Sequence, residues 1–417
     1  MIEYSWAPFS SFYKIPSRNG VYVTKENHGF GISIINMGEL FGTEFVKHGE
    51  GEKVNLSETE KTNSMLEDGD LLFARRSLVE SGAGKCSIVY EPTEEMTFES
   101  SVIRVRLDNT RANPLFYYYW FKSTVGRRAM KTLVTGSNVK GIKGSELENL
   151  LVPNIPIDKQ NQIVDFLLRL DKKIILNNTI CADLEAMAKQ MYDYWFTQYD
   201  FPDENGKPYK SSGGKMVFNE DINREIPDGW EVKQLSDIAS LETNSVFPDN
   251  HTYYNHYSIP AYDDNKTPAY EIGSSIASNK YLVEHNSILV SKLNPQFKRI
   301  WLAKNPPEHS ICSTEFLPIK SNNSEMPFLY SVLCSDSFSV HLVQKATSST
   351  GSRKRIDPTN CLSFEFAYNE DIANKYSEIM NDCVERIEKI PVENKQLSEL
   401  RDFLLPMLMN GQIKIGT

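Results

Sequence analysis

The chain has few of the residues that build metal sites and disulfide frameworks. It holds six cysteines and seven histidines in 417 residues, and no two cysteines form a Cys-x-x-Cys pair. We therefore expect free thiols, and neither a disulfide framework nor a bound metal. No run approaches the roughly 18–20 apolar residues of a membrane span, and the first residues lack the basic and apolar regions of a signal peptide. These absences predict a cytoplasmic protein.

The composition is that of a globular chain of two to four domains, with 40% hydrophobic and 24% charged residues. Its net charge of -10 argues at first against a nucleic-acid partner. The charge is uneven, however: residues 65–144 hold twelve Lys or Arg against nine Asp or Glu, and residues 280–356 hold ten against five. Two basic segments in an acidic chain suggest two anion-facing surfaces, although ordinary surface variation explains the charge alone equally well.

The two halves of the chain repeat each other with a shift of roughly 215 residues. Segments 69–76 and 286–293 both read as a turn, a buried strand and a basic residue at the strand's exit. Segments 114–120 and 327–330 both read as a buried helix that begins with proline. Thr-Gly-Ser loops at 135–140 and 350–355 follow, and each precedes a short apolar strand and a long helical stretch. The common order predicts a tandem duplication.

The two long stretches carry heptad seams at residues 163–195 and 376–408, where apolar positions alternate by four and three. Two helices of about 40 residues, each about 60 Å long, are expected to pack on one another in antiparallel fashion. Pro391 should kink the second helix near Ile387. Each seam contains one asparagine, Asn177 and Asn394, and a buried pair of these amides would fix the helix register. The alternative is that both amides are solvated.

Several short sequence segments are typical of one family. They are Asp193-Tyr194-Trp195-Phe196, the loop from Glu204 to Gly214, Ile226-Pro227-Asp228-Gly229-Trp230 and the stretch from Leu400 to Pro406. Over nearly its whole length the chain resembles the specificity subunit of a type I restriction-modification system. The resemblance implies an α+β fold in which two pseudo-repeated globular target-recognition domains are separated by two long antiparallel helices. We expect the domains at residues 1–155 and 226–367, the central helix at 156–199, a linker loop at 200–225 and the C-terminal helix at 368–417.

The resemblance also implies the function. Each domain would read one half of a bipartite site in double-stranded DNA, with an unread spacer between the halves. In the family, adenine methylation with S-adenosylmethionine belongs to modification subunits, of which two are expected, and ATP- and Mg-dependent translocation and cleavage belong to restriction subunits. The chain itself would then carry no catalytic residue and no cofactor. Two alternatives stay open: a self-contained DNA methyltransferase or nuclease, and a coiled-coil adapter that binds only proteins.

The candidate DNA contacts lie in the Thr-Gly-Ser loops and at the exits of the paired strands. Glycine permits close backbone approach to a phosphate, Lys and Arg reach guanine, and Asn can pair with adenine. The candidates are Arg75, Arg76, Gly136, Ser137, Lys140, Lys143, Lys292, Asn294, Lys298, Arg299, Thr350, Gly351, Ser352, Arg353, Lys354 and Arg355. A solvated surface charge explains any single one of them equally well. The aromatic run from Tyr117 to Phe121 could stack on bases, but its helical spacing favours a place in the core.

Two segments resemble parts of catalytic motifs but lack residues that these motifs require. Asn305-Pro306-Pro307 is followed by Glu308, where an amino-methyltransferase carries an aromatic ring to stack on a flipped adenine. Gly84-Lys85-Cys86 lacks the first glycine and the final Ser or Thr of a phosphate-binding loop. We interpret both as turns.

Overall fold

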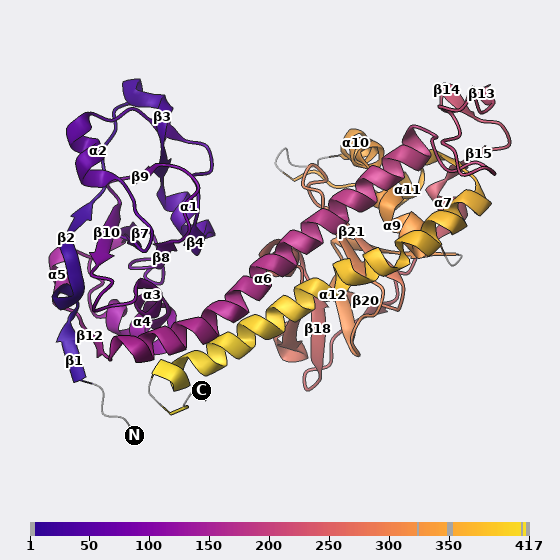
Figure 1. The fold of residues 1–417 in the computed structure, drawn as a ribbon. Helices are drawn as coiled ribbons and strands as arrows, with labels where there is room; N and C mark the ends of the chain where they lie inside the picture. The colour runs from indigo at the N-terminus through magenta and orange to yellow at the C-terminus, as the bar shows by residue number, and fades with distance from the viewer. Residues whose placement is uncertain (1–4, 323–324, 348–352, 410–411, 414–417) are drawn as a thin grey trace. The chain divides into compact units, whose positions relative to one another are not determined.

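The computed structural model describes residues 5–322, 325–347, 353–409 and 412–413 (Figure 1). The chain divides into two compact units. The first contains the residues up to Lys173 and those from Leu397 on, and the second runs from Ile174 to Gln396. Each unit therefore takes in part of both long helices. The predicted domain boundaries concern a finer division and stay predictions.

The first unit is built on a five-stranded sheet of order β2-β10-β6-β8-β4. All pairs are antiparallel except β4 with β8. The strands are β2 (Tyr13–Asn19), β4 (Phe45–Val46), β6 (Leu71–Ala74), β8 (Cys86–Val89) and β10 (Val102–Leu107). The helix α3 (Pro114–Lys122) begins at a proline after the cap Asn113, and the aromatic run from Phe116 to Phe121 on it is buried. The expectation that this run belongs to the core is confirmed.

The second unit has a four-stranded antiparallel sheet of order β16-β24-β21-β22. Its strands are β16 (Ala239–Leu241), β21 (Ser287–Ser291), β22 (Ile300–Ala303) and β24 (Phe316–Ser321). The helix α9 (Met326–Cys334) has a proline in its first turn and a buried aromatic ring, Phe328, in the largest core cluster of the unit. Three further helices belong to this unit: α7 (Leu235–Ile238), α10 (Asp336–Lys345) and α11 (Pro358–Leu362).

The predicted duplication is confirmed strand by strand. The order β2-β10-β6-β8 in the first unit matches β16-β24-β21-β22 in the second. The antiparallel pair of β1 (Ser5–Pro8) with β12 (Leu151–Asn154) matches that of β15 (Glu231–Gln234) with β25 (Glu365–Tyr368). The helices α3, α4 (Thr124–Lys131) and α5 (Gly144–Glu148) correspond to α9, α10 and α11 in chain order. The two units therefore share one framework.

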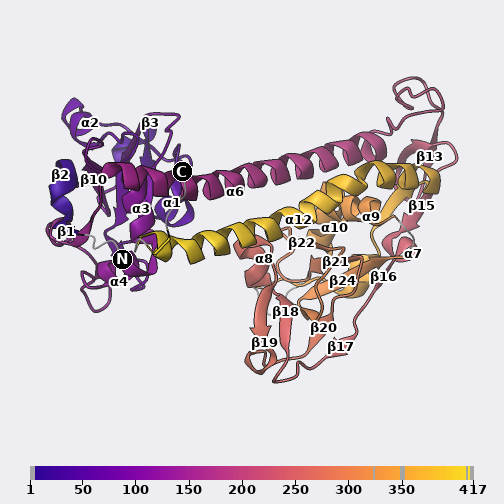
Figure 2. The ribbon, with the colours of Figure 1, turned by 60° about the horizontal axis from the view of Figure 1, so that its bottom comes forward.

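The units differ in the second sheet that each framework carries. In the first unit it has three strands, β5 (Lys53–Val54), β3 (His28–Ile35) and β9 (Met96–Phe98), beside the helices α1 (Met37–Gly42) and α2 (Glu58–Ser64). In the second unit it has five strands, β17 (Ser245–Val246), β20 (Lys280–Leu282), β23 (Ser310–Ser313), β18 (Tyr253–Tyr257) and β19 (Ala269–Ile272), beside α8 (Ile259–Asn265). Figure 2 shows this sheet projecting away from α12. A further hairpin joins β13 (Met216–Asn219) to β14 (Arg224–Pro227).

The two predicted long helices are present as α6 (Ile157–Tyr192), which ends in a π-helical turn at Asp193–Thr197, and α12 (Glu370–Met409). Every predicted seam position on them is buried or half-buried. The start of α6 packs with the end of α12 in the first unit, and the end of α6 packs with the start of α12 in the second. The pair is therefore antiparallel. The helix α12 continues through Pro391 without a break.

The two seam asparagines form the predicted pair. Asn177 is 2% exposed, and its Nδ2 donates to Asn394 Oδ1 at 2.9 Å. Asn394 Nδ2 donates in turn to Asn178 Oδ1 at 2.7 Å. Asn177 Nδ2 also donates to Glu393 Oε2 at 3.0 Å. A hydrogen bond between two amides in an apolar seam disfavours any register that would leave one of them without its partner. Their role in fixing the register stays a prediction.

A buried ion pair lies in the same seam within the first unit. Arg401 Nη1 is 2.6 Å from Asp171 Oδ1, and the Tyr119 hydroxyl donates to Asp171 Oδ2 at 2.6 Å. Burial lowers the pKa of Arg401, but the attraction of Asp171 and Asp402 outweighs it and the net pKa is raised. Burial and the adjacent Asp171 carboxylate raise the pKa of Tyr119. The ion pair therefore joins α6 to α12, and the Tyr119 hydroxyl joins α3 to the same carboxylate.

Candidate DNA-contact surfaces

In the first unit, the basic residues after β6 meet the Thr-Gly-Ser loop. The strand β7 (Arg76–Ser77) pairs antiparallel with β11 (Lys140–Gly141), and Ile142 N donates to Arg75 O at 3.0 Å. Thr135 and Gly141 exchange two backbone hydrogen bonds of 2.9 Å, which closes the loop into a hairpin. We call the surface formed by Arg75, Arg76, Gly136, Ser137 and Lys140 the first basic surface.

In the second unit, the residues after β21 meet the second Thr-Gly-Ser loop in the same way. Ile356 N donates to Lys292 O at 3.1 Å, and Thr347 and Arg355 exchange two backbone hydrogen bonds of 2.9 Å. A β-bridge joins Leu293 to Arg355. We call the surface formed by Lys292, Asn294, Lys298, Arg353 and Lys354 the second basic surface. Thr350, Gly351 and Ser352 lie outside the described residues.

The two surfaces thus rest on equivalent backbone hydrogen bonds at equivalent positions of the framework. Gly136 is needed for the first hairpin, because its φ is +105° and an added Cβ would lie 2.2 Å from Val139 O. In the second, Asn294 adopts a left-handed φ of 51°, its N donates to Lys354 O at 2.8 Å, and its Oδ1 accepts from Lys354 N at 3.1 Å. Asn294 therefore positions the loop, and only part of its amide is available for a base.

Arg76 is the most available cation of the first basic surface. It is exposed and forms no ion pair with any residue that the structure describes. Arg75 is half-buried, with Nη1 3.3 Å from Ser100 O, and Lys140 Nζ donates to Gly136 O at 2.9 Å. Lys143 lies at the start of α5 and pairs with Glu146 at 3.3 Å. The sequence-predicted residues are brought together, but Lys143 is directed to its own helix.

Three predicted cations of the second unit are held by acceptors within the unit. Arg299 makes two hydrogen bonds of 2.6 and 2.8 Å to the Asp263 carboxylate, and Arg355 makes two of 3.1 and 2.8 Å to the Glu315 carboxylate. These bonds raise the pKa of both arginines. Lys298 Nζ donates to the backbone carbonyl of Cys334. A phosphate would have to compete with these partners.

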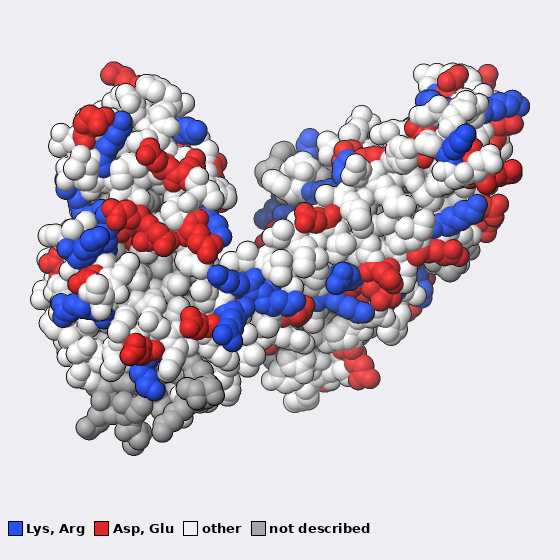
Figure 3. All heavy atoms as spheres, viewed as in Figure 1, with Lys and Arg blue, Asp and Glu red and all other residues white. Residues whose placement is uncertain are grey.

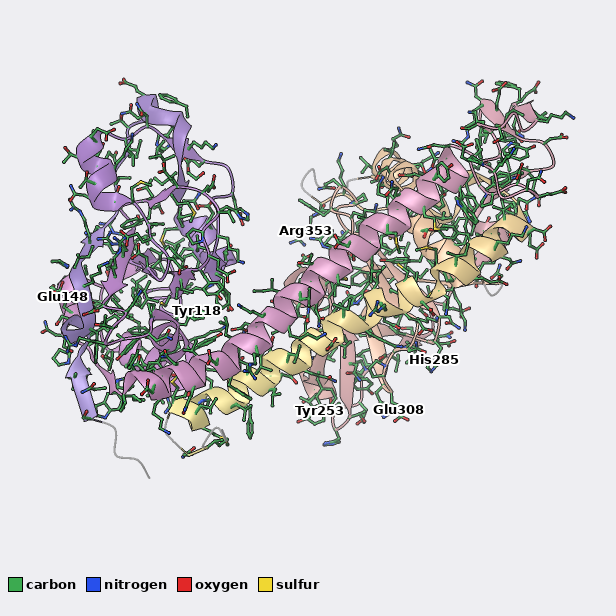
Figure 4. All side chains as sticks on the ribbon, viewed as in Figure 1. Tyr118, Glu148, Tyr253, His285, Glu308 and Arg353 are labelled. Atoms are coloured by element: carbon green, nitrogen blue, oxygen red, sulfur yellow. The ribbon has the colours of Figure 1, made fainter. Side chains whose placement is uncertain are left out.

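Apart from Lys298, the exposed cations of the second basic surface are Arg353 and Lys354, and Lys292 is half-buried beside them. None of the three forms an ion pair within the described residues of the chain. Arg353 is labelled in Figure 4. Figure 3 shows acidic and basic side chains interspersed over the face that it presents. Whether a given cation is free to contact DNA therefore depends on the acidic groups beside it.

Sequence reasoning missed two apolar side chains at these surfaces. Leu78 directly follows β7 and is 84% exposed, and Phe297 lies between Asn294 and Lys298 and is 56% exposed. The signal that could have found them is a large apolar residue inside a loop of polar and turn-forming residues.

The described residues contain neither a metal-binding cluster nor a membrane-spanning helix. Among residues 5–322, 325–347, 353–409 and 412–413, no group of three or more His, Cys, Asp or Glu is arranged to hold a metal ion. No helix within these ranges is long and apolar enough to cross a membrane.

The chain is similar to known specificity subunits. It is 30% identical over 145 residues to the type I restriction enzyme MjaIX specificity subunit of Methanocaldococcus jannaschii, covering 35% of this chain and 32% of that protein. It is 25% identical over 325 residues to the HindI specificity subunit of Haemophilus influenzae, covering 62% of this chain and 68% of that protein. The first match therefore spans about a third of the relative's length.

The fold is also that of a solved structure. The type I restriction-modification S subunit from M. genitalium superposes with a TM-score of 0.58 at 14% identity, over 100% of this chain and 98% of that one. The family model of the type I restriction modification DNA specificity domain matches residues 13–186 and 227–354, which include both basic surfaces. Because these matches cover both repeats and most of the chain, the protein belongs to the type I restriction modification DNA specificity family.

Proposed function

We propose that the chain is the non-catalytic DNA-recognition subunit of a type I restriction-modification system. Each globular domain would read one half of a bipartite site, and the bases between the halves would go unread. The observation that carries this proposal is that in both frameworks the residues at a strand exit bond to the residues that flank a Thr-Gly-Ser sequence, so that cations from both segments lie at the same place. Membership of a DNA specificity family supports it.

Each basic surface carries groups that suit contacts to phosphate and groups that suit contacts to bases. Backbone N–H groups of a glycine loop and lysine side chains bind phosphate oxygens and set the position of the protein on the duplex. An arginine side chain that is free of internal partners, as Arg76 and Arg353 are among the described residues, can bind guanine O6 and N7 in the major groove. Each correct base pair contributes about 1–3 kcal/mol of discrimination.

The proposal places the chemistry on other proteins. Two modification subunits would methylate adenine with S-adenosylmethionine, and restriction subunits would use ATP and Mg, all in the cytoplasm. The relatives are named as specificity subunits, which supports a division of labour between reading and catalysis. Incubating the purified chain with labelled S-adenosylmethionine and duplex DNA tests this division. Methyl transfer without added subunits would make the chain an enzyme and end the proposal.

The test of DNA binding is charge reversal at the second basic surface. The probe is a duplex that carries the methylated motif identified by sequencing of the host genome. The control is Lys207→Glu with Lys210→Glu, which makes the same charge change at two exposed lysines of the linker loop. Arg353→Glu with Lys354→Glu should weaken binding of the full chain, assembled with its modification subunits, far more than this control does.

The salt dependence makes the test specific. If both side chains of the test variant contact phosphate, the slope of log affinity against log salt should fall by about 1.8, since each lost contact removes about 0.9. Unchanged affinity and slope in the test variant would show that this loop does not face DNA and would favour the protein-only adapter.

A further inference from the structure

Large apolar side chains are exposed to water at both basic surfaces, and Val79 beside Leu78 is 60% exposed as well. Leu78 is 84% exposed in the loop from β7 to β8, and Phe297 is 56% exposed in the loop from β21 to β22. These loops are equivalent, because β6 and β8 occupy the same places in the first sheet as β21 and β22 in the second. Exposed apolar side chains occur singly on most proteins, but here they recur in equivalent loops of a duplicated framework.

The loop in the second unit holds Phe297 outward. Phe297 N donates to Asn294 O at 2.9 Å and closes a tight turn in which Pro295 is buried. The Arg299 guanidinium lies 5.3 Å from the centre of the Phe297 ring, a cation–π contact. Arg299 is itself fixed by its two hydrogen bonds to Asp263. The ring is therefore supported from one side and leaves its other face to the solvent.

The loop in the first unit turns sharply beyond Leu78. The Ser77 hydroxyl accepts from Val79 N at 3.1 Å, and Gly82 N donates to Val79 O at 3.1 Å. An added Cβ at Gly82 would lie 2.3 Å from Ser77 Oγ, so the chain folds back closely on itself there. Leu78 lies directly before this turn and directly after the pair of β7 with β11 that holds Arg76.

The charges around these side chains indicate what would cover them. The cores of protein interfaces are depleted of charge and rich in aromatic residues, whereas here Leu78 with Val79, and Phe297 in the other unit, lie beside several cations. Arg76 and Lys140 flank Leu78, and Lys292, Lys298 and Lys354 belong to the surface that carries Phe297. An apolar wedge between cations is the arrangement with which proteins separate stacked base pairs while basic groups hold the adjacent phosphates.

We propose that Phe297 and Leu78 are wedges that enter the base stack of duplex DNA, one in each half-site. This inference rests on the proposed function. Insertion of a wedge costs least at pyrimidine–purine steps, because these steps unstack easily. Each wedge would therefore favour sites that have such a step at the point of insertion, without a hydrogen bond to a base. Phe297 should act more strongly than Leu78, because its ring can stack on a base.

The test measures unstacking directly. The full chain, assembled with its modification subunits, is titrated into duplexes of the recognised motif in which 2-aminopurine replaces one adenine at a time along both half-sites. Binding should raise the emission at one step in each half-site. Phe297→Ala should abolish the rise in one half-site and weaken binding on the order of tenfold, while the slope against salt stays as in the unchanged protein because no phosphate contact is lost.

The matched control is Phe247→Ala, which removes an equally large ring that is 64% exposed in the same unit and lies outside the second basic surface. It should keep both the emission rise and the affinity, and Leu78→Ala should abolish the rise in the other half-site alone. If Phe297→Ala binds and unstacks the duplex as the unchanged protein does, the wedge is wrong and the proposed function stands. If the unchanged protein does not bind the duplex, both fail.

Discussion

The ion pair between Asp171 and Arg401 offers a quantitative test of how the first unit is held together. Asp171→Ala leaves the Arg401 guanidinium buried without its closest acceptor and removes the acceptor of the Tyr119 hydroxyl. Breaking a buried pair from one side costs about 3–5 kcal/mol. Asp402, 3.0 Å from Arg401 Nε, and Glu44, 3.9 Å from Nη1, compensate part of the charge, so we expect about 3 kcal/mol.

A second variant separates the cost of breaking the ion pair from the net contribution of the pair to the free energy of unfolding. Asp171→Leu, Arg401→Met and Tyr119→Phe together remove all three polar groups and keep apolar volume in the seam. Replacing a buried ion pair by apolar residues of similar volume is often neutral or stabilising, so this triple variant should be within about 1 kcal/mol of the unchanged protein. The triple variant should therefore be more stable than the single one, although both lack the carboxylate.

Hydrogen exchange is the suitable assay, because it reads the first unit separately from the second. A loss of about 3 kcal/mol should accelerate exchange of the most protected amides of α3 about a hundredfold, since about 1.4 kcal/mol corresponds to a factor of ten. The reasoning is refuted if Asp171→Ala changes exchange less than about tenfold, or if the triple variant exchanges as fast as the single one.

Two further predictions concern the second unit. Asn177→Leu alone should destabilise it by about 1–3 kcal/mol, because the Asn394 amide loses a buried partner, whereas Asn177→Leu with Asn394→Leu should recover the loss in chemical denaturation. Burial lowers the pKa of His256 despite its contact with Glu271, so the folded unit binds the proton less readily than the unfolded chain does. Stability should therefore be full above the unfolded pKa of about 6.5 and decline as the pH falls through the folded pKa, and melting curves of His256→Gln should lack this decline.

The sequence predicted those features that depend on local pattern. Heptad spacing identified both seams and the facing places of Asn177 and Asn394, because periodicity and residue type are enough to decide which side of a helix is buried. The repeat was visible because each half keeps the same order of strand, helix and glycine loop. The second sheets were not predicted, since strands as short as β5 or β17 leave little periodic signal.

The availability of the candidate cations could not be predicted from local pattern. Arg299 and Arg355 are occupied by Asp263 and Glu315, which lie 36 and 40 residues away along the chain. Only the folded sheet brings these acids to the loops. In the same way, the sequence pattern does not explain why Arg401 occupies a position in an apolar seam. The fold explains it, because Asp171 of the other long helix lies beside Arg401 and pairs with it.

The first unit combines residues from both ends of the chain, and this has a consequence for folding during translation. Leu405 and Leu408, close to the end of the sequence, belong to the same core as Phe9 and Leu71 near its start. When residue 173 has been translated, roughly 220 more must follow before that core is complete, which takes tens of seconds at about 5–20 residues per second. Throughout this interval the early segment of the chain carries an uncovered apolar stripe, which makes it a client for chaperones and a target for proteases until the last helix arrives.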